Sequence, residues 1–117
     1  MLKRFTELKV WQKAHWLVLL IYKLTNKFPP EEKFGLSVQM RRAAVSVASN
    51  IAEGFRRYHN KVSGNFYDIS DGSLEELKYQ TFLSKDLKYI NIQEYNQALA
   101  LSEEVSKMLR SWIKSQK

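Results

Sequence analysis

The sequence contains no cysteine, which excludes disulfides and thiolate metal sites. Its two histidines, His15 and His59, offer too few metal ligands, and no Glu-x-x-His pair of the di-iron bundle type is present. A glycine-rich phosphate loop and a serine elbow are also missing. We therefore expect no metal, no cofactor, no catalytic residue and no enzymatic activity.

Long apolar runs are missing as well. The longest, Trp16 to Tyr22, has seven residues, far short of the roughly 20 that span a bilayer. The first apolar positions alternate with charges, unlike a secretory signal. These features predict a soluble cytoplasmic protein with no membrane partner.

Positive charge is in excess. The 117 residues include 19 Lys/Arg and 12 Asp/Glu, a formal charge of +7. An excess of this size permits attraction to nucleic acid or to other anionic surfaces, but demonstrates neither.

The few prolines and glycines leave long segments with helical apolar spacing. This spacing predicts helices at about 7–27, 31–57, 63–90 and 92–114. Pro29-Pro30 separates the first two helices, and Asn91 with Glu94 is a capping pair for the fourth. Four long amphipathic helices with short connections predict one all-α domain over residues 1–117, an antiparallel up-down-up-down four-helix bundle.

The second helix has two apolar stripes where a surface helix needs one. The first stripe is Leu36, Met40, Ala43, Val47 and Ile51; the second is Val38, Val45 and Ala52, with Arg41 and Ala48 alongside. Because a four-helix bundle has no central helix, the second stripe favours a homo-oligomer. The predicted interface residues are Arg41, Arg42, Val45, Ala48, Asn50, Ala52 and Glu53.

A polar ladder of Arg42, Ser46, Asn50 and Glu53 runs between the two stripes. Arg42 and Glu53 lie about 16 Å apart along a helix axis and cannot pair with each other. We expect each to find its partner on a neighbouring helix or subunit. A solvated polar face is the alternative, and a catalytic ladder is a third.

Basic residues with interleaved aromatics follow the second helix, where Phe55 and Tyr58 alternate with Arg56, Arg57, His59 and Lys61. This segment is the first candidate for contacting a phosphate backbone. A second candidate set, expected near the other end of the bundle, is Lys3, Arg4, Lys9 and Lys13. Most other aromatic residues fall on apolar stripes, where packing is the expected role.

The run FPPEEKFGLSVQMRRAAVSVASNIAEGFRR, with ELKVWQKA before it and GSLEEL after it, resembles a known family. This is the four-helix-bundle family encoded by intervening sequences of bacterial 23S ribosomal RNA genes, also labelled S23 ribosomal proteins. Lys88 stands where many relatives are expected to have glycine. The resemblance implies a bundle that assembles as a ring, a pentamer. A related branch assists reverse transcriptases of diversity-generating retroelements and binds the polymerase and nucleic acid.

Two functional hypotheses follow. In the first, the chain is a non-enzymatic oligomer that binds RNA or DNA through basic rims. In the second, it is a protein–protein scaffold or accessory subunit that does not touch nucleic acid, its charge serving solubility or an acidic partner. The molecular function of the family at large is unknown.

Overall fold

The computed structural model describes residues 1–57 and 61–116, and within them it contains four α-helices and no β-strand. The helices are α1 (Lys9–Thr25), α2 (Leu36–Arg56), α3 (Ser63–Asp86) and α4 (Ile92–Ser115), with two short 3-10 turns at Phe5–Glu7 and Pro30–Glu32. The prediction of an all-α fold is confirmed. In this described part of the chain, no helix is long and apolar enough to cross a membrane.

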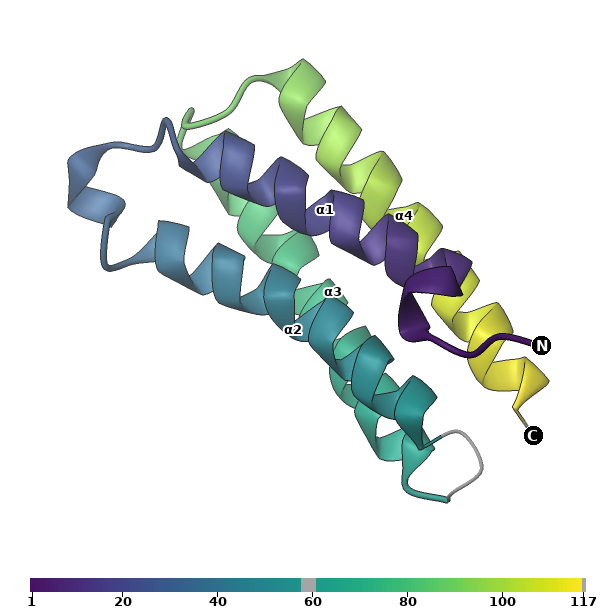
Figure 1. The fold of residues 1–117 in the computed structure, drawn as a ribbon. Helices are drawn as coiled ribbons and strands as arrows, with labels where there is room; N and C mark the ends of the chain where they lie inside the picture. The colour runs from purple at the N-terminus through teal and green to yellow at the C-terminus, as the bar shows by residue number, and fades with distance from the viewer. Residues whose placement is uncertain (58–60, 117) are drawn as a thin grey trace.

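Each helix packs against two others, so the four surround a common core. α1 contacts α2 and α4, and α3 also contacts α2 and α4. Figure 1 shows the α1–α2 and α3–α4 connections at one end of the elongated molecule and both termini towards the other. The start of α1, the end of α2, the start of α3 and the end of α4 therefore gather at the end that holds the termini.

All four helices contribute to the core. The largest fully buried side chains include Leu17, Ile21, Met40, Ile51, Tyr67, Leu74, Leu77 and Leu109. Burying one such side chain contributes about 1.5–3 kcal/mol. The first apolar stripe of α2, from Leu36 to Ile51, is buried as predicted.

The second helix begins later than residue 31, the predicted start, because a carboxylate forms its N-terminal cap. Glu32 lies in the 3-10 turn, and its Oε1 accepts the backbone N–H of Leu36 at 2.9 Å. Its Oε2 accepts the hydroxyl of Tyr89 at 2.9 Å, which raises the pKa of that hydroxyl above its ordinary value. One side chain thus ties the α1–α2 connection to the α3–α4 connection.

The third helix ends at Asp86, four residues before the predicted end, in a Schellman motif. The N–H of Tyr89 donates to the carbonyl of Ser84 and the N–H of Lys88 to that of Lys85, both at 2.9 Å. Lys88 has φ 64°, in the left-handed region that favours glycine. The predicted cap of α4 is confirmed, because Asn91 and Glu94 bond each other's backbone N–H at 2.8 Å.

Gly54 lets α3 approach α2 closely. A Cβ atom placed on Gly54 would lie 2.3 Å from Cε1 of Tyr67, closer than two carbon atoms can come. The Tyr67 side chain is fully buried, so its ring cannot swing out into solvent to make room. Any side chain at position 54 must push the two helices apart.

The substitution Gly54→Ala should lower the free energy of unfolding by about 1–3 kcal/mol, because it overpacks this contact. Urea unfolding at fixed protein concentration measures the change. The matched control is Gly72→Ala in α3, where a Cβ meets nothing within 4 Å. Removing that glycine from a helix should raise stability by about 0.5–1 kcal/mol. Effects of the same sign at both positions would contradict the steric argument.

The substitution Lys88→Gly should raise the free energy of unfolding by about 1 kcal/mol, since it removes the clash of Cβ in the left-handed conformation. Thermal or urea unfolding tests this. Lys88→Ala is the control, because alanine keeps the Cβ and should change stability little. An equal gain from alanine would show that the lysine side chain, and not the backbone angle, is responsible.

Candidate functional site

The second apolar stripe of α2 is only partly covered within the subunit, and Ala48 beside it is buried. Val45 is 39% exposed, while Val38 and Ala52 are half-buried. Three adjoining open hollows run between α2, α1 and the N-terminal segment, with volumes of about 570, 330 and 930 Å³. The first two share Val45 in their walls, and the last two share Ala52. We call this continuous depression the α2 groove.

The predicted interface residues all line the α2 groove. They are Arg41, Arg42, Val45, Ala48, Asn50, Ala52 and Glu53. Ala48 and Ala52 carry only a methyl group, so another helix could come close to α2 at this point. The opposite wall of the groove belongs to α1, which contributes Trp11, His15 and Tyr22.

Arg41 is held by α1 and does not project freely into the groove. Its Nε donates to Oγ1 of Thr25 at 2.8 Å, and its guanidinium lies 4.6 Å from the ring centroid of Tyr22. The aromatic face and the hydroxyl compensate part of the cost of burying the charge. Arg41 therefore forms a fixed basic wall at one end of the groove.

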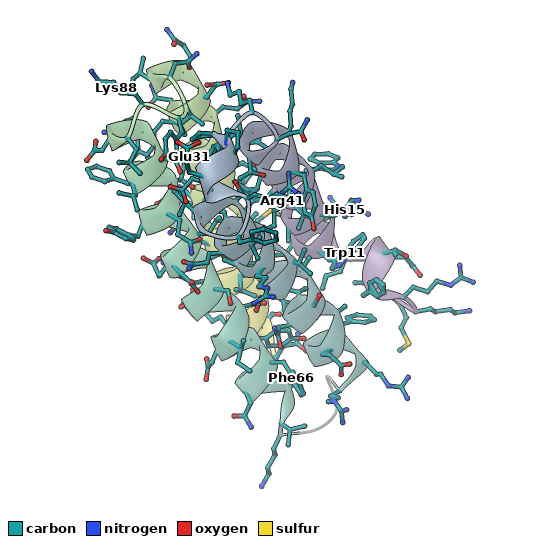
Figure 2. The ribbon with its side chains drawn as sticks, turned by 90° about the vertical axis from the view of Figure 1, so that its left-hand side faces the viewer. Trp11, His15, Glu31, Arg41, Phe66 and Lys88 are labelled. Atoms are coloured by element: carbon teal, nitrogen blue, oxygen red, sulfur yellow. The ribbon has the colours of Figure 1, made fainter. Side chains whose placement is uncertain are left out.

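Aromatic side chains line the middle of the groove, in the hollow of about 330 Å³. Trp11 packs edge-on against Phe5 at 4.9 Å between centroids and stacks on His15 at 5.2 Å with an interplanar angle of 6°. Figure 2 shows Trp11 and His15 together on one side of the molecule, next to the N-terminal turn. These contacts join the N-terminal segment to α1.

The polar ladder finds most of its partners within its own subunit. Asn50 Nδ2 donates to the Ser46 carbonyl at 2.9 Å, and the hydroxyls of Ser46 and Ser73 lie 2.8 Å apart. Glu53 pairs with Arg57 at 3.4 Å, so the prediction that Glu53 needs a neighbouring helix or subunit is wrong. The pair lies four residues apart on one helical face, a spacing that the sequence analysis did not consider.

Arg42 differs from the rest of the ladder. Its side chain is exposed and, among residues 1–57 and 61–116, forms no hydrogen bond or ion pair. It lines the groove beside Val45 and stays a candidate for a contact between subunits.

Net positive charge is confined to one end of the bundle. The segments at this end carry nine Lys/Arg and three Asp/Glu, a formal charge of +6 out of +7 for the chain. These segments are residues 1–12, 53–57, 61–68 and 105–116. Residues 13–52 and 69–104 carry nine of each sign and are neutral. The nine cations of this basic end are Lys3, Arg4, Lys9, Arg56, Arg57, Lys61, Lys107, Arg110 and Lys114.

Apart from Lys13, the two predicted sets of nucleic-acid-binding residues meet at this basic end. Lys3, Arg4 and Arg56 line the same hollow, of about 930 Å³. The prediction that Lys3, Arg4, Lys9 and Lys13 lie near the other end of the bundle is therefore wrong. The physical reason is that α2 runs back along α1, which brings its last residues beside the start of the chain.

Two of the remaining predicted cations, Arg57 and Lys13, are engaged within the subunit. Arg57 pairs with Glu53, and its guanidinium lies 5.3 Å from the ring centroid of Phe66. Lys13 pairs with Glu104 at 3.1 Å and lies 4.8 Å from the Trp16 ring centroid, outside the basic end. Lys61 is exposed, and Lys9 lines a separate hollow on the α4 side.

Phe55 is buried against Trp112, with ring centroids 6.2 Å apart, so it cannot stack on a base as predicted. Tyr58 and His59, the other members of that segment, lie outside the described residues. Next to this contact, burial raises the pKa of the Tyr67 hydroxyl above its ordinary value. The ring of Phe55 is thus part of the core that supports the basic end.

Sequence reasoning missed the contribution of α4. Lys107, Arg110 and Lys114 follow one another at steps of three and four near the end of the helix, all exposed. Cations in the last turns of a helix interact favourably with the negative end of its dipole. The position of these three cations near the end of the fourth helix could therefore have been read from the sequence. In the described part of the chain, no cluster of three or more His, Asp or Glu could hold a metal ion.

Comparisons agree with the resemblance seen in the sequence. The model of a family described as 23S rRNA-intervening sequence protein matches residues 6–111. A similar solved structure is the crystal structure of a protein with unknown function from the S23 ribosomal protein family of Bacteroides thetaiotaomicron VPI-5482. Its TM-score is 0.81 at 27% identity, covering 90% of this chain and 95% of that chain. No curated protein matches the chain.

Proposed function

The chain belongs to the 23S rRNA-intervening sequence protein family, and on this premise we propose that it is a cytoplasmic, non-enzymatic homo-oligomer that binds RNA or DNA. Each subunit is an antiparallel up-down-up-down bundle, and its basic end contacts the phosphate backbone. The similar solved structure is of a protein with unknown function. Support for the proposal therefore comes from the surface of this chain.

The observation that carries the proposal is the confinement of net charge to the basic end. The basic end carries nine cations and three acids, so the electrostatic potential there is positive. Phosphate contacts from lysine and arginine supply most of the affinity in binding without sequence preference. The same net charge spread evenly over the molecule would offer fewer cations to a phosphate backbone at any one place.

The α2 groove supports assembly. It is an open depression with an apolar stripe on its floor and with small residues that admit another helix. We propose that it contacts another copy in a head-to-tail ring, a pentamer by family resemblance. Five copies carry a formal charge of about +35, so weak contacts at each basic end add through multivalency.

The same groove favours a second candidate, an accessory subunit that binds a protein partner and no nucleic acid. The two candidates differ in what accompanies the purified oligomer. Nucleic acid that co-purifies and is removed by nuclease, seen in the ultraviolet absorbance spectrum, supports the first. A spectrum typical of protein alone, before and after nuclease, supports the second.

The substitution Val45→Arg should break the oligomer into single chains of 13.8 kDa. Val45 is 39% exposed, so one subunit can accommodate arginine, but an apolar interface cannot bury its unpaired charge. Light scattering after size exclusion measures the mass, and circular dichroism checks that helix content is kept.

The control for this experiment is Ile92→Arg, at the start of α4 and 51% exposed, which adds the same group away from the groove. It should leave the mass unchanged. A wild-type protein that is a single chain, or a Val45→Arg protein of wild-type mass, would contradict the assembly proposal.

The double variant Lys3→Ala, Arg56→Ala should bind duplex DNA several-fold more weakly. The slope of log affinity against log salt should become shallower by about 0.9 for each lost phosphate contact with the duplex. A fluorescence anisotropy titration at several salt concentrations measures both. The matched control, Lys23→Ala with Lys33→Ala, removes the same charge from exposed positions at the other end. Equal losses from both double variants would show that only total charge matters.

A further inference from the structure

A separate hollow of about 530 Å³ opens between the N-terminal segment and the end of α4. Its floor is mainly apolar, with Leu8, Val10, Met108 and Trp112, and the first two side chains are at most 5% exposed. The volume lies within the range of small-molecule pockets, about 300–1,000 Å³. The hollow is lined by α1, α4 and the N-terminal segment; it shares Leu2 with the α2 groove but contains no residue of α2.

The rim of this hollow is basic. Lys9 and Lys107 line it, both are exposed, and in the described part of the chain neither forms a hydrogen bond or ion pair. The acid in the lining, Glu7, is occupied by the backbone. Its Oε1 accepts the N–H of Arg4 at 3.1 Å and that of Lys3 at 3.4 Å. The two lysines are thus free to meet an anion.

We propose that this hollow takes an unpaired base of single-stranded RNA or DNA, a step beyond the proposed function on which it rests. The base lies against Met108 and Trp112, and Lys9 and Lys107 contact the phosphates on either side. An apolar floor next to two free cations matches the chemistry of one nucleotide in a strand, which carries a flat aromatic base and a negative backbone. Paired bases in a duplex are stacked and cannot enter.

The test compares one single strand with one duplex. Oligothymidylate of about 20 nucleotides, and the same strand paired with oligoadenylate, are titrated by fluorescence anisotropy. The wild type should bind the single strand more tightly. Ser111→Phe fills the mouth of the hollow from an exposed position of α4. It should lower single-strand affinity about tenfold and leave duplex affinity within about twofold.

A matched control and a second variant keep the test independent of folding effects. Ala100→Phe adds the same ring at an exposed position of α4 outside the hollow and should leave both affinities unchanged. Lys107→Ala removes a rim cation and should weaken single-strand binding more than Lys114→Ala, which removes a cation of the same basic end that does not line the hollow. Equal losses from the two lysine variants would overturn the assignment of the rim.

The outcomes separate this inference from the proposed function. If Ser111→Phe lowers the affinities for the single strand and the duplex equally, or lowers neither affinity, the hollow holds no base. If the wild type binds the duplex with a salt dependence but shows no preference for the single strand, this inference fails and the proposed function stands. If the wild type binds neither oligonucleotide, both fail.

Discussion

The close contact between α2 and α3 is the constraint on which the rest of the structure depends. At one point Gly54 admits the ring of Tyr67, and at another the hydroxyl of Ser70 donates to the carbonyl of Val47 at 2.5 Å. Each contact needs a small residue on one of the two helices, Gly54 in α2 or Ser70 in α3, and together they hold α3 against one side of α2. Because α1 takes a second side and the 3-10 turn at Phe5–Glu7 also contacts α2, the side with Val45 is only partly covered by the described residues.

Features that depend on residues within one or two turns could be predicted from the sequence. The capping pair of Asn91 and Glu94 and the buried stripe of α2 are of this kind. Features that depend on which helix ends meet could not. The start of α2 is set by Glu32, whose carboxylate is positioned by the turn before the helix. Lys3 and Arg56 are far apart in the chain, and only the return of α2 along α1 makes them neighbours.

The arrangement of helices also explains why the charge is concentrated at one end. Nine of the twelve acids lie away from the end that holds the termini, at the α1–α2 connection, in α3 from Asp71 to Asp86 and in α4 from Glu94 to Glu104. Ion pairs such as that of Lys78 with Glu103 neutralise these segments within the bundle. At the basic end, three acids face nine cations, so repulsion among the cations is left uncompensated. That repulsion is relieved when a polyanion binds.

The two proposed surfaces meet, so assembly and polyanion binding are linked. Lys3 and Arg56 share a hollow with Ala52 and Glu53, which also belong to the α2 groove. A second copy that covers the groove therefore brings its own charges to the edge of this hollow. Association concentrates the cations of several copies, which opposes assembly, and a polyanion that bridges the copies offsets this cost. By thermodynamic linkage, if assembly strengthens polyanion binding by a given free energy, polyanion binding stabilises the oligomer by the same free energy. In the proposed oligomer, the uncompensated charge of the basic end would thus limit assembly when no ligand is bound, and a bound polyanion would remove that limit.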